Sequence, residues 1–83
     1  MKIFLISQTQ NTGYDTFDSA VVVAEREEDA RLTIPDNISG WPSTWGEDYS
    51  TWCKNPEDVT VTYLGEAKEG SLPGVVCASF NAG

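Results

Sequence analysis

The chain has 83 residues, which predicts one domain (residues 1–83), and it carries 13 acidic and five basic side chains with no histidine, a formal charge of −8 at pH 7. A charge of this sign repels nucleic acids and anionic membranes, so neither a direct nucleic-acid binder nor a membrane protein is expected. It suits a partner with a basic surface, although single-sign surfaces also serve solubility alone.

Two apolar segments open the chain and predict a β-hairpin. Residues 2–8 read KIFLISQ, with apolar side chains on both faces of an extended strand, which is typical of a central strand. A second strand is predicted over residues 16–24, TFDSAVVVA. The link between them is rich in turn formers and too short for a crossover, so the two strands should be antiparallel.

A short helix and a long irregular segment follow. The sequence EREEDARL predicts a helix over residues 25–32, because acidic side chains crowd its first turns, where the helix dipole favours them, and Pro35 stops it. Ala30 and Ile34 are four residues apart and are expected to face the sheet. Residues 35–56 hold all three tryptophans, and a loop of this length is often functional.

Two more strands complete the predicted sheet. Residues 57–67, EDVTVTYLGEA, alternate apolar and polar side chains, and residues 75–80, VVCASF, form the last strand after a second loop, with strict alternation. The order β-β-α-loop-β-β predicts an α+β fold in two layers. We expect a four-stranded, mostly antiparallel sheet, one short helix on one of its faces, and a long tryptophan-rich loop.

Asp15 and Asp18, at the start of the second strand, are the first candidates for chemistry. Carboxylates three residues apart would bind a divalent cation or work as an acid–base pair. An extended backbone points them to opposite faces, so a shared site is not expected, and turn chemistry accounts for Asp15. If this turn meets the C-terminal tail, polar side chains of both would form one wall of a ligand or partner site. These candidate binding residues are Tyr14, Asp15, Ser19, Ser79 and Asn81.

The two cysteines, Cys53 and Cys77, offer little catalytic chemistry, because nucleophilic cysteines and serines depend on a base and the chain has no histidine. Two cysteines without histidine also make a poor zinc site, so we predict no enzyme activity, no metal and no cofactor. Cys77 alternates with apolar residues and is expected to be buried, whereas Cys53 is expected to be more exposed. The N-terminal apolar run is too short for a signal peptide, which predicts a cytoplasmic protein with reduced thiols.

The tryptophans are the best interaction signal in the sequence. Trp41, Trp45 and Trp52 are spaced by four and seven residues, which suits one helical face. Pro42 and Gly46 argue against a long helix here. Tryptophan is enriched in interface hot spots, and a small domain also uses its largest side chains to close its core. All three are therefore candidate binding residues, and at least one of them is expected in the core.

Several segments resemble a family of small bacteriophage and prophage proteins that has no established activity. They are MKIFLISQ, GYDTFDSAVVVAE with EDAR, PEDVTVTYLGEA and VVCASFNAG. The similarity covers most of the chain, is weakest across the tryptophan-rich loop, and is most specific in GYDTFDS and ASFNAG. The resemblance transfers no catalytic residues. It implies a phage accessory protein that acts in the cytoplasm of a bacterial host.

By analogy, small acidic phage proteins of this sort are often counter-defence factors. The expected function is therefore non-enzymatic binding to a host protein with a basic surface, in the manner of an anti-CRISPR-like or DNA-mimicking inhibitor. The acidic surface that is expected to contact the host protein comprises Glu25, Glu27, Glu28, Asp29, Glu47 and Asp48. Two alternatives stay open: an oligomeric protein that sequesters a signalling nucleotide, and a structural, self-assembling phage protein. A homodimer is compatible with all three functions.

Overall fold

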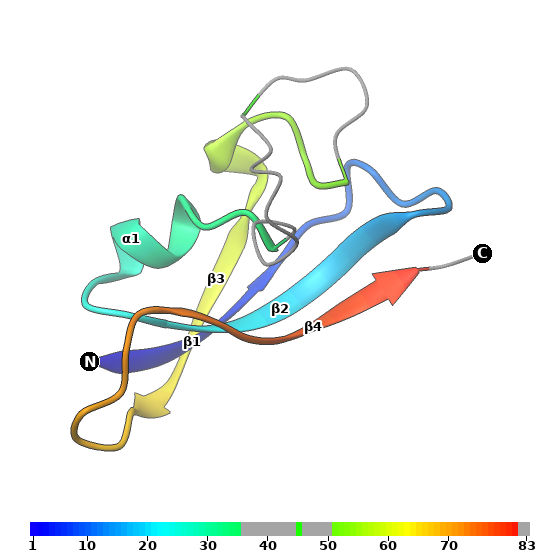
Figure 1. The fold of residues 1–83 in the computed structure, drawn as a ribbon. Helices are drawn as coiled ribbons and strands as arrows, with labels where there is room; N and C mark the ends of the chain where they lie inside the picture. The colour runs from blue at the N-terminus through cyan, green and yellow to red at the C-terminus, as the bar shows by residue number, and fades with distance from the viewer. Residues whose placement is uncertain (36–44, 46–50, 82–83) are drawn as a thin grey trace.

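Four antiparallel strands form one sheet, whose order is β3-β1-β2-β4 (Figure 1). The computed structural model describes residues 1–35, 45 and 51–81. The predicted α+β fold is confirmed, because the sheet is four-stranded and antiparallel and is accompanied, in these residues, by one short α-helix. The elements are β1 (Lys2–Ser7), β2 (Thr16–Ala24), α1 (Glu27–Arg31), β3 (Thr60–Glu66) and β4 (Gly74–Asn81).

Strand β1 is central in the sheet, as expected for a strand whose side chains are apolar on both faces. It pairs with β2 and β3, so that Phe4 lies opposite Val22 on one side and opposite Tyr63 on the other. Strand β2 has the bounds that the alternation of the sequence predicts. The short connection before it makes β1 and β2 antiparallel, and the predicted hairpin is confirmed.

The helix α1 is shorter than residues 25–32, over which the sequence predicts a helix. It begins at Glu27, because Arg26 still has extended backbone, with φ −137° and ψ 159°. Three acidic residues occupy its first turn, where the helix dipole favours them. Ala30 and Ile34 are buried, as their spacing predicts, and they anchor this segment on the sheet.

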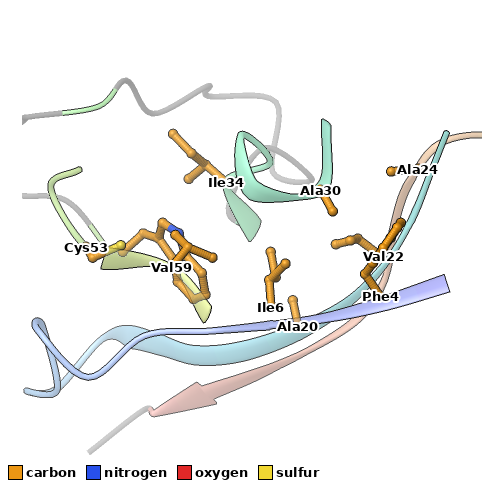
Figure 2. Packing of buried hydrophobic residues seen from close by; sticks show 10 residues of the cluster. Phe4, Ile6, Ala20, Val22, Ala24, Ala30, Ile34, Cys53 and Val59 are labelled. Atoms are coloured by element: carbon orange, nitrogen blue, oxygen red, sulfur yellow. The ribbon is translucent and has the colours of Figure 1, made fainter. Parts of the chain in front are cut away.

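The hydrophobic core lies between one face of the sheet and a layer that holds α1 and the 3-10 turn η2 (Pro56–Asp58) (Figure 2). Alternate residues of the two central strands point into it, and the fully buried side chain of Trp52 packs among them. We call the sheet surface toward this core the covered face and the opposite surface the open face. The buried cluster comprises Phe4, Ile6, Ala20, Val22, Ala24, Ala30, Ile34, Trp52, Cys53 and Val59.

A β-bulge in β4 changes which of its side chains face the core. Val21 lies opposite Cys77. The next residue, Val22, lies opposite Val75, which leaves Val76 as an extra residue on β4. Val75 packs against the core, whereas Cys77 is exposed. The strict alternation that the sequence predicts for this strand is therefore wrong at the bulge.

The two cysteines have the opposite burial to that expected from the sequence. Cys53 has 1% of its surface exposed, and Cys77 is exposed. Cys53 directly follows Trp52 and enters the core with it. Cys77 faces away from the core because it lies opposite Val21, and the bulge at Val76 lets Val75 face the core although it is two residues from Cys77. Both cysteines are free thiols.

Candidate binding surfaces

The turn between β1 and β2 meets the end of β4, which brings several of the polar candidates together. The backbone N–H of Asp15 donates a hydrogen bond to the Asn81 carbonyl at 2.6 Å. The Asn81 side-chain amide donates to the Gly13 carbonyl at 3.1 Å. Ser19 lies opposite Ser79 where β2 and β4 pair. Two segments that are distant in the sequence therefore form one end of the sheet, as a shared site would require.

Asp15 serves the turn through its backbone. Its φ of 60° is in the left-handed region, which aspartate tolerates better than most residues. Its side chain is exposed, and so is that of Tyr14, at 77%. This conformation fits the interpretation of Asp15 as a turn residue, and it leaves a carboxylate and a phenol ring in solvent.

Gln8, which the sequence reasoning missed, holds the same turn from inside. It is 3% exposed, and its side-chain amide donates to the carbonyls of Asn11 and Phe17, each at 2.8 Å. Its side-chain oxygen accepts hydrogen bonds from the backbone N–H groups of Gln10 and Asn11. The feature of the sequence that could have predicted this role is the position of Gln8, a polar residue directly after an apolar strand. Gln8 satisfies backbone groups that would otherwise need water, and so it has a structural role.

A shallow hollow of about 200 Å³ lies on the open face beside the turn. Ser19 and Ser79 contribute to its lining, together with Leu5, Val21 and Cys77. Asp15, Tyr14 and Asn81 are not among its lining residues. The hollow is smaller than typical ligand pockets, which range from about 300 to 1,000 Å³. The polar candidates therefore do not converge on one enclosed pocket in the described part of the chain.

A larger hollow, of about 400 Å³, lies between α1 and the loop that joins β3 to β4. Two acidic residues, Glu25 and Asp29, line it. Most of the other lining residues offer apolar surface, among them Met1, Val23 and Pro73. This combination suits a side chain with a hydrocarbon stem and a cationic head, because Lys and Arg lay their stems along apolar surface while the charged group stays at a polar rim.

The acidic candidates in the described residues gather around α1. Glu25, Glu27 and Glu28 are exposed. Asp29 is half-buried and pairs with Arg26 at 3.5 Å, and this contact raises the pKa of the Arg26 guanidinium. The pairing leaves the three glutamates as the exposed negative charges of this segment. Glu47 and Asp48, the other members of the predicted acidic surface, lie outside the described residues.

Arg31 is a structural cation. Its guanidinium donates hydrogen bonds to the backbone carbonyls of Pro56 and Val59, and so it ties the end of α1 to η2. The exposed Glu57 and the half-buried Asp58 belong to η2 and therefore lie in the same layer as α1. Arg26 pairs with Asp29, and the nearby Glu28 and Glu25 also raise its pKa, so Arg26 offsets part of the negative charge around α1.

The tryptophans have different environments. Trp52 is fully buried, so its assignment as a binding residue is wrong, because a small core uses its largest side chain to fill its volume. The expectation that at least one tryptophan belongs to the core is confirmed. Trp45 is half-buried and packs against the core cluster. Trp41 lies outside the described residues.

Two other ionisable groups have shifted pKa values, and both lie away from the two hollows. Burial raises the pKa of the Cys53 thiol, and the Asp58 carboxylate raises it further. The Tyr63 hydroxyl donates to the Glu66 carboxylate at 2.8 Å, and this hydrogen bond raises the pKa of Tyr63. A catalytic centre usually gathers such groups in a cleft. The two pKa shifts instead result from core packing around Cys53 and from one hydrogen bond on the edge strand β3.

No protein-family model matches the chain, and no curated protein or solved structure matches it significantly. Over residues 1–35, 45 and 51–81, no helix is long and apolar enough to span a membrane. The same residues hold no group of three or more His, Cys, Asp or Glu side chains placed to bind a metal ion.

Proposed function

We propose that this chain is a non-enzymatic binding protein that docks on a basic surface of a host protein through the hollow between α1 and the β3–β4 loop. The observation that carries the proposal is the composition of this hollow. Glu25 and Asp29 supply carboxylates, and Val23 and Pro73 supply apolar surface, within about 400 Å³. A lysine or arginine of the partner would lay its stem on the apolar surface and bond its charged head to Glu25 and to Asp29, whose exposed 3.5 Å pair with Arg26 it would displace.

The charge around the hollow supports the same proposal. Glu27 and Glu28 are exposed on the adjoining helix, and the whole chain has a formal charge of −8. Such a field steers a basic partner toward the molecule and raises the association rate more than the affinity. Together with the resemblance to phage accessory proteins, it favours a counter-defence inhibitor that acts in the host cytoplasm. A groove that normally binds nucleic acid is a suitable target, because it already carries the matching basic residues.

The test is a pull-down with the tagged chain from bacterial lysate at rising salt, with a paired variant. We expect one host protein to be enriched at low salt and released as salt screens the charges. Glu25→Gln with Asp29→Asn should abolish this capture. Asp18→Asn with Glu57→Gln removes the same charge outside the hollow and should preserve it. Equal losses in both double variants, or no enriched protein at low salt, would contradict the proposal.

A second candidate function, the binding of a small ligand, is favoured by the contact between the β1–β2 turn and the end of β4. This contact places Asp15 and Asn81 within hydrogen-bonding distance and leaves Tyr14 exposed beside them. None of the five basic residues belongs to this turn or to β4, so a nucleotide phosphate would find no cation there. For this reason we rank it second.

Calorimetry with a panel of cyclic nucleotides tests the ligand function. The variant Asp15→Ala distinguishes a ligand-binding role of Asp15 from its role in the turn. A left-handed backbone disfavours alanine, so the turn role alone predicts a loss of about 1 kcal/mol of stability. Lost binding with unchanged stability would support a site at the turn. Lost stability with unchanged binding, or no heat with any nucleotide, would leave Asp15 a turn residue.

A further inference from the structure

Strand β4 leaves one edge of the sheet without a partner strand. It is the last strand in the order β3-β1-β2-β4, so among the described residues β2 alone pairs with it (Figure 1). An edge strand presents a row of unpaired N–H and C=O groups, which proteins usually guard with charged side chains or proline. The other edge strand, β3, ends in Glu66, whereas the sequence of β4, GVVCASFN, contains neither a charge nor a proline. The edge of β4 is therefore open to an added strand.

The outward backbone groups of this edge belong to Ala78 and Phe80. The Asn81 carbonyl accepts a hydrogen bond from the Asp15 N–H at 2.6 Å, so the backbone of Asn81 points toward the side of β2. The irregularity in this part of the pairing leaves its extra residue, Asp18, on β2, and β4 itself stays regular here. Successive residues of a regular strand point their N–H and C=O groups to alternate sides. Ala78 and Phe80 therefore direct theirs away from β2, where an added strand would meet them.

The side chains beside these backbone groups are apolar and partly exposed. Ala78 lies opposite the buried Ala20 and packs against the core cluster. Phe80 lies opposite Phe17, with the two ring centroids 4.8 Å apart, and 46% of its surface is exposed. Because Ala20 and Phe17 both contact the core, Ala78 and Phe80 belong to the covered side of the sheet. Alternate side chains of an added strand would pack on them and extend this side by one strand.

The hollow at the beginning of β4 indicates the charge of the segment that would add there. Gly74, the first residue of β4, lines this hollow together with Glu25 and Asp29. An extended chain covers the span from Ala78 to Gly74 in about 13 Å, so a segment paired with Ala78 passes the hollow within about four residues. The bulge at Val76 bends β4 between the two, and the long stem of a lysine or arginine spans the bend. A cation at this place would meet both carboxylates.

We propose that the partner contributes an extended segment that adds to the edge of β4 as a fifth strand, with apolar side chains on Ala78 and Phe80 and a lysine or arginine in the hollow. An antiparallel segment forms the more stable pairing, and it brings its C-terminal end to Gly74, so the cation lies at that end. A second copy of this chain does not fit, because each copy has a formal charge of −8. The inference rests on the proposed function, since it places the partner's cation in the same hollow.

A capped synthetic peptide, in which valine and threonine alternate before a C-terminal lysine, tests the strand addition on the unmodified full chain by NMR. We expect hydrogen exchange of the Ala78 and Phe80 amides to slow by at least about tenfold in the complex. Methylation of the peptide amides that face β4 should weaken binding by at least about tenfold, and so should norleucine in place of lysine. The same number of methyl groups on the amides that face away is the matched control and should preserve binding. Equal losses in both methylated peptides, or no binding at millimolar peptide, would overturn the proposal.

A variant of the protein distinguishes this inference from the proposed function. Ala78→Pro removes an outward N–H and costs no hydrogen bond to β2, so it should fold, as circular dichroism would show, and should lose both the peptide and the captured host protein. Ser79→Ala, at a residue whose backbone faces β2, is the control and should keep both. Capture that survives Ala78→Pro but not Glu25→Gln with Asp29→Asn would overturn strand addition and leave the proposed function standing. Peptide bound at the edge with no host protein captured at low salt would support strand addition and contradict the docking on a host protein.

Discussion

The two faces of the sheet are built from the same strands and have opposite surface chemistry. On the covered face, Ile6 and Trp52 are sealed beneath a layer whose outside carries most of the described acids. On the open face, Leu5 and Val21 stay half-buried. None of the residues that pair across the sheet on this face is charged. The described charges therefore lie mostly on the side of the covered face, and the open face carries uncharged residues.

The largest expected effect lies in the covered core. Trp52→Ala should lower the free energy of unfolding by about 3–5 kcal/mol, because it removes the largest fully buried side chain. Urea denaturation followed by circular dichroism measures it. Trp45→Ala is the control, and it should cost less than half as much because Trp45 is only half-buried. Equal losses of unfolding free energy in the two variants would contradict the assignment of Trp52 as the main tryptophan of the core.

The next prediction compares two neighbours in β1 that point to opposite faces. Ile6→Ala should cost about 3 kcal/mol, since Ile6 is fully buried. Leu5→Ala should cost about 1 kcal/mol at concentrations where the chain is a monomer, because Leu5 is half-buried and its cavity would open to water. Denaturation midpoints of both variants give the comparison. A Leu5 cost equal to that of Ile6 in the monomer would mean that the chain itself covers the open face.

A smaller effect separates the two arginines of the acidic layer. Arg31→Met should cost about 1.5 kcal/mol, because it leaves the Pro56 and Val59 carbonyls without their charged donor. Arg26→Met removes a salt bridge whose arginine side chain is 68% exposed, and it should leave the free energy of unfolding almost unchanged. Thermal unfolding of the two variants measures the difference. If Arg26→Met costs more stability than Arg31→Met, the hydrogen bonds from Arg31 to η2 are not what stabilises the layer of α1 and η2.

The smallest effect is a dependence on pH from the buried thiol. Burial and the Asp58 carboxylate raise the pKa of Cys53, so the folded state holds this proton more tightly than the unfolded state. The resulting stability is present below the unfolded thiol pKa of about 8.5, and it is lost as the pH rises through the higher folded value. Unfolding free energies measured on both sides of this window should fall with pH. Cys53→Ala should flatten the curve, and an unchanged slope would contradict the assignment.

The sequence predicted the sites less completely than the fold. Turn chemistry at Asp15 followed from residue types, whereas the meeting of the turn with Asn81 was a condition for a shared site that only the structure supplied. The hollow beside Glu25 and Asp29 did not, because three of its eight lining residues, Met1, Pro73 and Gly74, come from segments far from both acids in the sequence. A site assembled from three separate segments has no local signature. Gln8 was missed although it directly follows an apolar strand, since its burial depends on how the turn folds back over it.

The sequence by itself determined the order of the elements, the bounds of β2, the central place of β1 and the packing of Ala30 and Ile34. These features depend on the periodicity of neighbouring residues and on the conformational limits of turn formers, and both are local properties. Only the tertiary structure decided which cysteine is buried and which face of the sheet stays open. Cys53 is buried because it enters the core with Trp52, and Cys77 is exposed because it pairs with Val21 of a strand that is remote in sequence. The open face is the one on which α1 and the buried cluster do not pack.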